Sequence, residues 1–250
     1  EVSDSFHKIL KRQGVKFNLS SKVNSVKNNG NKAIVEFEKD GANHNLEADT
    51  VLVCVGRKPN TDGLKLDSIG VEQDEKGRVK IDKNFKTNVK NVYAIGDVVV
   101  GPMLAHKAEE EGIAVAEMIS GKYGHVNYDV IPNVVYTHPE IASVGKTEEE
   151  LKKQSIEYNV GKFPFMANSR AKVNDEADGF VKILADKKTD KVLGVHIVGP
   201  DAGNLIAELS LAMEFGASSE DIARTCHAHP TLTEAIKEAA LAVDKRPIHM

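Results

Sequence analysis

The stretch YAIGDVVVGPMLAHKAEEEG, residues 93–112, decides how this chain can be interpreted. Its apolar first part predicts a buried strand that ends at Gly96 and Asp97, and the Ala- and Glu-rich part predicts a helix over about residues 104–119. A strand, a loop and a helix in this order place a ligand at the carboxyl edge of a sheet. Asp97 could accept hydrogen bonds from ligand hydroxyls there, and the helix start favours negative charge. The same residues are also compatible with an ordinary turn at Gly96 and Asp97 that binds no ligand.

The residues before this stretch follow a different apolar spacing. KFNLSSKVNSV (16–26) and KAIVEFE (32–38) alternate with period two around NNGN, which predicts a β-hairpin. TVLVCVG (50–56) is a continuous β-branched run, typical of a strand buried on both faces of a parallel sheet. Residues 1–14 predict an amphipathic helix ending at Gly14, which we expect either to pack poorly without sheet partners or to pair with another chain.

From about residue 127 the pattern changes to alternating strands and helices. This order predicts an antiparallel α+β domain after Rossmann-like α/β segments. We therefore expect three regions: residues 1–57, 58–126 and 127–250. The predicted strands are PNVVYT, ASVGKT, YNVGKFPF, GFVKILAD and KVLGVHIVG, and the predicted helices are TEEELKKQ, GNLIAELSLAMEFG and a final helix.

Composition narrows the classes of partner. The 250 residues are 41% hydrophobic, which is enough for a substantial core. The net charge of −4, without long runs of one sign, does not indicate a positively charged surface that would bind nucleic acid or an anionic membrane. No apolar run approaches the roughly 20 residues that span a bilayer. The two cysteines, Cys54 and Cys226, suit a reducing compartment. We expect a soluble intracellular protein.

Several motifs follow one another in the order of a known family. Residues 93–112 resemble the second flavin-binding motif of the flavoprotein disulfide oxidoreductases, and among these the dihydrolipoamide dehydrogenases. VLVCVGRKPNT is similar to the strand that closes the family's NAD domain. NVVYTHPEIASVG, GKFPFMANSRA, DGFVKI and HAHPTLTEA are similar to its dimerisation domain.

The resemblance implies FAD and NAD as cofactors. Asp97 would hold the flavin ribitol, and Met103, Leu104, Ala105 and His106 would line the flavin ring. A helix start near the flavin would stabilise its anionic reduced form. Alternatively, His106 is a half-buried histidine that only packs against its neighbours.

Two further residues are implied for NAD. Val23 would approach the adenosine, and Gly56 the nicotinamide side, where a glycine lets backbone come close to a ligand. An ordinary strand valine and a strand-end glycine fit equally well.

The stretch CHAHPTLTEA, residues 226–235, offers three interpretations. A zinc site lacks the second spaced pair of ligands that such sites usually have. A capping box with Thr231 as N-cap and Glu234 three residues later explains two residues but not His229. An acid/base pair of His229 and Glu234 uses all of them, because a carboxylate fixes the tautomer of an imidazole and raises its pKa.

In the family that this chain resembles, such a pair takes a proton from a dihydrolipoamide thiol and acts across a dimer. His229 would be the base and Glu234 would orient it. Arg224 and His227 are candidate supporting residues, and Cys226 a packing residue. Residues 204–215 are apolar enough for a dimer interface or for burial in their own domain.

The chain contains neither a GxGxxG motif nor a C-x4-C pair. The resemblance therefore implies the second half of a dihydrolipoamide dehydrogenase, inactive in electron transfer by itself and colourless. Implied partners are a second copy and the lipoyl domains or core of 2-oxo acid dehydrogenase complexes. The compartment would be the mitochondrial matrix in a eukaryote or the cytoplasm in a bacterium. Alternatives are a non-catalytic dimerisation or docking module and a reductase of glutathione or mercuric-ion type.

Overall fold

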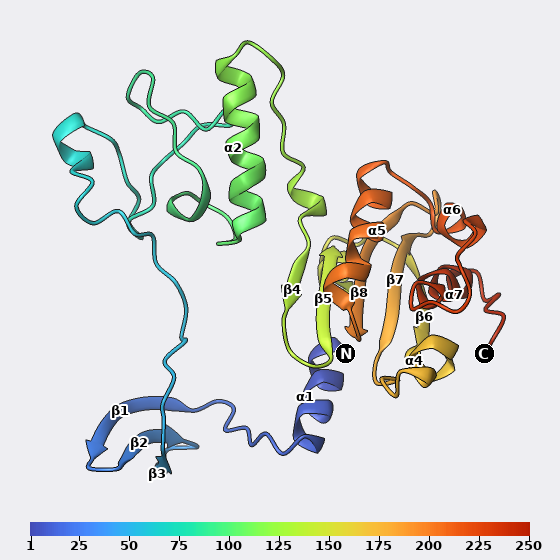
Figure 1. Ribbon diagram of the computed structural model, residues 1–250. Coiled ribbons are helices and arrows are strands. Elements are labelled where there is room, and N and C mark those ends of the chain that lie inside the picture. Colours follow the sequence, from blue (N-terminus) through green and yellow to red (C-terminus); the bar gives the residue numbers. More distant parts are fainter. The chain divides into compact units, whose positions relative to one another are not determined.

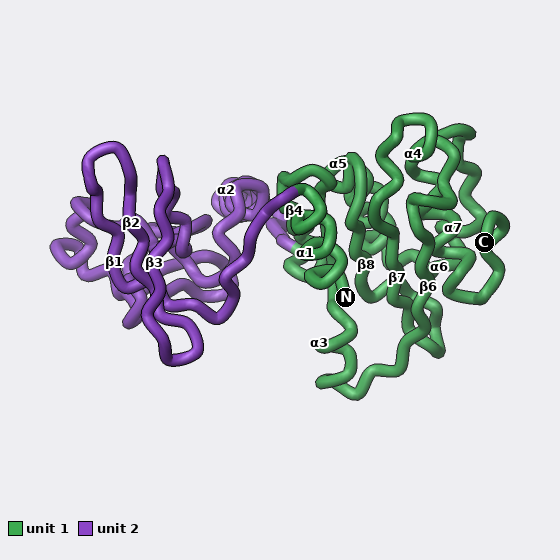
Figure 2. Tube along the Cα trace, turned by 90° about the horizontal axis from the view of Figure 1, so that it is seen from below, with its two compact units in different colours: residues 1–13, 127–250 green, residues 14–126 purple.

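The computed structural model describes residues 1–250 and divides into two compact units. Unit 1 comprises residues 1–13 and 127–250, and unit 2 comprises residues 14–126 (Figure 2). Each unit is built from its own sheet and helices, and each is described by itself below.

The centre of unit 1 is a five-stranded antiparallel sheet with the order β4-β5-β8-β7-β6 (Figure 1). Side chains that alternate along the strands place Ala142, Val181, Ile183 and Ile197 in the core. The predicted antiparallel α+β domain is confirmed. Its strands are β4 (Asn133–Val135), β5 (Glu140–Gly145), β6 (Tyr158–Pro164), β7 (Phe180–Asp186) and β8 (Val192–Gly199).

Helices α5 and α7 supply the apolar residues that bury one face of this sheet. Ile206 and Leu209 of α5 and Ile236 and Ala239 of α7 belong to the same buried cluster as the strands. The helices of unit 1 are α1 (Val2–Arg12), α3 (Glu148–Lys153), α4 (Ser169–Val173), α5 (Ala202–Glu214), α6 (Ser219–Arg224) and α7 (Glu234–Val243), with short 3-10 turns at Tyr128–Val130 and Phe165–Ala167.

Helix α1 departs from its prediction. The helix forms as expected, but the expected poor packing is wrong, because Ile9 is only 4% exposed and packs against Phe180 and Val198. The apolar stripe of α1 therefore finds a partner on the sheet of unit 1.

Unit 2 contains a three-stranded antiparallel sheet, β1-β2-β3, and one long helix. The predicted hairpin is confirmed: Asn29 pairs with Lys32 around Gly30, whose φ of +70° suits a glycine. The predicted helix at residues 104–119 is confirmed as α2. The elements are β1 (Lys22–Asn29), β2 (Lys32–Lys39), β3 (Ala42–Ala48), α2 (Ala105–Ile119) and 3-10 turns at Leu66–Ile69 and Gly96–Val98.

Two strands predicted in unit 2 are wrong. Residues 50–56 form no strand, and Leu52 and Val55 are 83% and 95% exposed. Residues 91–97 make only an isolated bridge, Lys86 to Tyr93, before the turn at Gly96. A strand of a parallel sheet needs neighbours on both sides, and the antiparallel sheet of unit 2 offers these segments none. None of the helices in either unit is long and apolar enough to cross a lipid bilayer.

Candidate active site

His229 and Glu234 form a hydrogen-bonded pair at the start of α7. His229 lies in the loop after α6, the peptide bond to Pro230 is cis, and Glu234 is the first residue of α7. The His229 Nδ1 to Glu234 Oε1 distance is 2.9 Å. The imidazole is 71% exposed, whereas the carboxylate is only 21% exposed. A fixed carboxylate thus holds one ring nitrogen, and the rest of the ring faces outward.

Glu234 is held in its ionised form by its neighbours. Burial by itself would raise its pKa, but the Thr231 N–H donates to Oε2 at 2.9 Å, and His229 binds the other oxygen. These hydrogen bonds and the positive charge of nearby imidazoles outweigh burial, so the pKa of Glu234 lies below its ordinary value. An ionised Glu234 accepts a hydrogen bond from the N–H at Nδ1, which leaves Nε2 of His229 as the basic nitrogen.

The predicted capping box is only half formed. Glu234 accepts from the Thr231 N–H as predicted, but the Thr231 hydroxyl donates to the Ala228 carbonyl, and the N-cap residue is Thr233. The prediction of Thr231 as N-cap is therefore wrong. The Thr231 N–H still holds Oε2 of Glu234, and Oε1 is the oxygen that pairs with His229.

Asn168 supports the loop from the other side. Its side chain is buried, its Nδ2 donates to the Thr231 carbonyl at 3.0 Å, and its Oδ1 accepts from the Ala171 N–H at 2.9 Å. The residue thus caps α4 and ties α4 to the loop of His229. The sequence analysis assigned no role to Asn168, and the only available signal was its position in the quoted stretch GKFPFMANSRA.

A small cavity of about 80 Å³ lies beside the pair. Its titratable lining residues are His229, Glu234, Glu238 and His249. The first two are the predicted pair, and the other two come from α7 and the last residues of the chain. The pocket is far too small to enclose a large ligand, so a reacting group must approach the exposed face of His229.

The three neighbours predicted around the pair lie elsewhere. Arg224 donates to Glu220, and Cys226 is exposed, so the prediction of Cys226 as a packing residue is wrong. His227 places Nε2 2.9 Å from Glu208 Oε1 and Nδ1 3.0 Å from the Thr225 carbonyl. The hydrogen bond to Glu208 raises the pKa of His227 despite partial burial. None of these contacts reaches His229.

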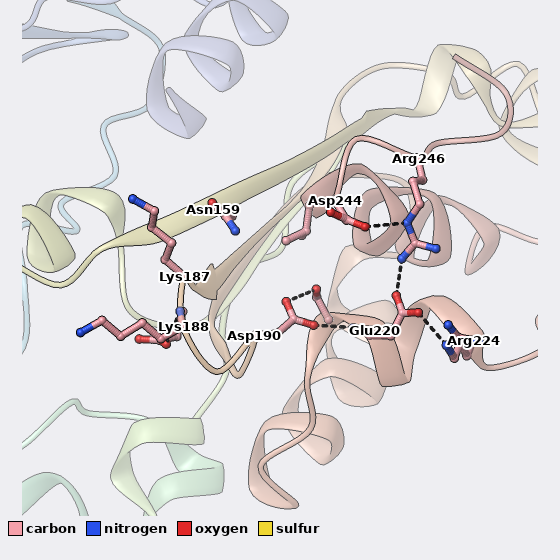
Figure 3. Close-up of a pocket in the computed structure, with 11 residues that line it drawn as sticks. Asn159, Lys187, Lys188, Asp190, Glu220, Arg224, Asp244 and Arg246 are labelled. Atoms are coloured by element: carbon pink, nitrogen blue, oxygen red, sulfur yellow. Dashed lines mark hydrogen bonds and ion pairs between the residues drawn. The ribbon is translucent and has the colours of Figure 1, made fainter.

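Arg224 instead lines a separate hollow of about 520 Å³ (Figure 3). Arg246 lies there between Glu220 and Asp244, and Glu220 also binds Arg224 (Figure 3). Its charged lining is balanced, with Lys187, Lys188, Arg224 and Arg246 against Asp186, Asp190, Glu220 and Asp244. This network ties α6 to the end of α7, and the Ser219 hydroxyl, which also lines the hollow, donates to the Asp190 carboxylate.

In unit 2, Asp97 lies in a 3-10 turn and pairs with a residue that was not predicted. Arg57 Nη2 is 2.8 Å from Asp97 Oδ2, and the Asp97 side chain is 34% exposed. Arg57 follows Gly56 directly, so the segment predicted for NAD lies beside the residue predicted for FAD. Gly56 itself is exposed with a φ of +135°, and Val23 on β1 is 58% exposed.

A buried ion pair holds the turn before Asp97. Lys107 and Glu111 are 0% and 1% exposed, and Nζ and Oε1 are 3.0 Å apart. Glu111 Oε2 accepts from the Gly96 N–H at 2.6 Å, and Lys107 Nζ donates to the Gly96 carbonyl at 3.2 Å. Both backbone groups of Gly96 are therefore bound by α2. The sequence analysis missed this clamp, although the i,i+4 spacing of Lys107 and Glu111 was a visible signal.

The start of α2 is the other predicted flavin segment. Leu104 is the N-cap in an extended conformation with no side-chain cap, and Ala105 begins the helix. Met103, Leu104 and His106 are half-buried, and Ala105 is exposed. First-turn N–H groups without a side-chain cap, a few residues after Asp97, suit an anionic or hydrogen-bond-accepting ligand.

Comparison with known proteins places both units in one family. Residues 131–240 match the pyridine nucleotide-disulphide oxidoreductase dimerisation domain, and residues 1–112 match the pyridine nucleotide-disulphide oxidoreductase domain. The chain belongs to the pyridine nucleotide-disulphide oxidoreductase family.

Relatives in sequence and structure agree with this family. The chain is 61% identical to "Dihydrolipoyl dehydrogenase 2, mitochondrial" of Arabidopsis thaliana over 100% of its residues and 50% of that protein. It is 59% identical to "Dihydrolipoyl dehydrogenase, mitochondrial" of Dictyostelium discoideum over 100% of its residues and 52% of that protein. A crystal structure of LpdA from Mycobacterium tuberculosis matches with a TM-score of 0.85 and 28% identity, over 94% of this chain and 51% of that one. The chain thus spans about half the length of these proteins.

The residues around Asp97 fit part of an FAD site. Asp97 can accept from hydroxyls, the backbone of Gly96 is fixed, and a Cβ on Gly96 would approach that of Ala108 to 3.1 Å. The glycine is thus required for the turn that presents Asp97. Val23 and Gly56, in contrast, share no contact that would define a nucleotide site, so their roles stay predictions.

Proposed function

We propose that this chain carries the acid/base pair, the second flavin-binding segment and the dimerisation domain of an FAD-dependent dihydrolipoyl dehydrogenase. The observation that carries the proposal is the 2.9 Å contact between His229 Nδ1 and Glu234 Oε1, in a chain 61% identical to a dihydrolipoyl dehydrogenase. The substrate class is a dithiol, dihydrolipoamide, with NAD⁺ as the final acceptor.

His229 takes a proton from a substrate thiol in this proposal. Glu234 holds the proton on Nδ1, so the lone pair of Nε2 faces the exposed side and accepts the thiol proton. The ionised carboxylate then stabilises the imidazolium that results. The product is a thiolate, which is the nucleophile of thiol–disulfide exchange.

The cofactor residues are Asp97 for the flavin ribitol and residues 103–106 for the flavin ring, with Val23 and Gly56 toward NAD. Bound FAD would supply a two-electron acceptor between the dithiol and NAD⁺. The contribution of this chain is to fix Gly96 through Lys107 and Glu111, so that Asp97 is presented in one orientation.

The partners in this proposal are a second copy of the chain and a lipoyl-bearing 2-oxo acid dehydrogenase complex. Leu211 on α5 and Phe215, the C-cap residue of α5, are 60% and 83% exposed and four residues apart, which suits an apolar contact with a second copy. The similarity to relatives named mitochondrial supports the mitochondrial matrix as the compartment.

The test is a chimera in which the N-terminal half of the Arabidopsis relative is joined to this chain. Its NADH formation from dihydrolipoamide is compared for the unsubstituted chimera and for His229→Gln. Loss of a general base lowers the rate about 100-fold or more. His125→Gln is the matched control, because His125 belongs to unit 2 and stacks on Tyr123. Equal rates for His229→Gln and His125→Gln would contradict the base role.

A non-catalytic dimerisation and docking module is the second candidate. It is favoured by the match of residues 131–240 to a dimerisation domain, in the unit that has the larger core. Light scattering of the 250-residue chain tests it, and a strict monomer without affinity for a lipoyl-complex core contradicts it. A glutathione or mercuric-ion reductase is distinguished by offering these substrates to the chimera.

A further inference from the structure

A second imidazole–carboxylate pair lies beside the first. His249 Nδ1 is 2.7 Å from Glu238 Oε1, and the Ile248 N–H donates to Glu238 Oε2 at 2.8 Å. Glu238 is only 4% exposed, whereas the His249 side chain is 66% exposed. A buried carboxylate is costly without a partner, and Ile248 and His249 supply the hydrogen bonds that Glu238 accepts.

Both carboxylates of α7 face the same cavity. Glu238 follows Glu234 by four residues, which is one helical turn, and the two side chains line the 80 Å³ cavity with His229 and His249. Like charges at this spacing on a partly buried face raise each other's proton affinity. A counter-charge beside Glu238 would remove this cause of a higher proton affinity in Glu234.

His249 is the group positioned to balance that charge. The remaining lining residues, Phe163, Ala167, Asn168 and Ser169, do not titrate near neutral pH. The basic side chains on adjacent elements are engaged elsewhere. Lys237 donates to the Ala223 and Thr225 carbonyls, and Arg246 binds Glu220 and Asp244.

We propose that His249 is a positioning residue for the His229–Glu234 pair: its imidazolium neutralises Glu238, and this keeps the carboxylate of Glu234 ionised and directed at His229. The catalytic meaning of this inference rests on the proposed base role of His229, but the electrostatic coupling does not. The charge of His249 also lowers the pKa of Glu234, although less than the hydrogen bonds from Thr231 and His229 do.

The experiment is an NMR titration of the Glu234 side-chain carboxyl carbon in the 250-residue chain, selectively labelled at glutamate. In His249→Gln, the proton-binding constant of Glu234 rises about threefold, because the negative charge of Glu238 is no longer balanced. His249→Lys restores the charge and returns the constant to that of the unsubstituted chain. His249 lies on the surface, so these variants leave the core intact.

Two further variants separate charge from packing. Glu238→Gln with His249→Gln removes both charges, so Glu234 titrates as in the unsubstituted chain. His125 belongs to unit 2 and does not line the cavity, so His125→Gln has no effect. An unchanged constant in His249→Gln, or equal constants in His249→Gln and His249→Lys, would overturn the proposal. Full activity of the His229→Gln chimera would overturn the base role but would leave this titration unchanged.

Discussion

The two units differ in how their apolar residues are buried. In unit 1 one continuous cluster joins the five-stranded sheet to α5 and α7. In unit 2 the buried residues form small separate clusters, one around Val71, Val79 and Val99 and another around Phe85 and Ala114. The apolar run at residues 50–56 of unit 2 lies in neither cluster.

This difference follows from where the segments that pair with each strand are found. The antiparallel strands of unit 1 pair with segments inside the unit, and β7 and β8 are joined by a short turn. The run at residues 50–56 is typical of a parallel sheet, whose strands need partners from distant segments. Apolar composition alone therefore does not secure burial, and the pairing partner decides it.

The largest expected effect concerns the one strongly buried polar network of unit 2. Glu111→Gln leaves Lys107 buried without a counter-charge, which we expect to cost about 4 kcal/mol locally. Hydrogen exchange of the α2 amides measures this loss of protection. Glu110→Gln on the exposed side of the same helix is the control. If the α2 amides are equally protected from exchange in Glu111→Gln and Glu110→Gln, the clamp on Gly96 does not stabilise unit 2.

The next largest effect is expected from replacing a buried leucine of unit 1, compared with an exposed leucine of unit 2. Leu209 is 0% exposed in the core of unit 1, whereas Leu52 is 83% exposed in unit 2. Leu209→Ala is expected to lower the free energy of unfolding of unit 1 by about 3 kcal/mol, and Leu52→Ala to change that of unit 2 by less than about 0.5 kcal/mol. Urea unfolding followed by circular dichroism measures both. A comparable loss from Leu52→Ala would show that residues 50–56 are buried in solution.

The smallest effect is a pH dependence of unit 1. Because the hydrogen bond to Glu208 raises the folded-state pKa of His227, its stabilisation is complete below the unfolded pKa and is lost as pH rises through the folded pKa. His227→Gln is thus expected to cost about 1 kcal/mol near pH 5.5 and less near pH 9. Urea unfolding at both pH values, with His125→Gln as control, measures it. A cost that is independent of pH would mean that the Glu208 contact does not stabilise the protonated ring.

Most of the fold of unit 1 was predictable because its patterns are local. Strand-like stretches predicted all five strands of its sheet, and helical stretches predicted α3, α5 and α7. Although α3, also six residues long, was predicted from TEEELKKQ, the short helices α4 and α6 were missed, because their five and six residues carry little periodicity. Their caps, Asn168 and Ser218, were the only local signals.

The candidate site likewise combines contacts that could be predicted from the sequence with contacts that could not. His229 and Glu234 lie five residues apart, so their pairing was open to prediction from sequence and is present in the structure. Asn168 and His249 reach the same cavity from distant positions, and no pattern within the motif indicated them. Arg224 and His227 are near His229 in sequence, yet their side chains bind Glu220 and Glu208.

The sequence by itself determined which residues could carry acid/base chemistry, where the long helices and the antiparallel strands lie, and which family the chain belongs to. These properties depend on residue type, short-range periodicity and ordered motifs. Only the tertiary structure decided that residues 50–56 are exposed, that Lys107 and Glu111 fix Gly96, and that a second imidazole–carboxylate pair adjoins the first. Burial and charge balance depend on which distant side chains meet, and spacing along the chain does not specify that.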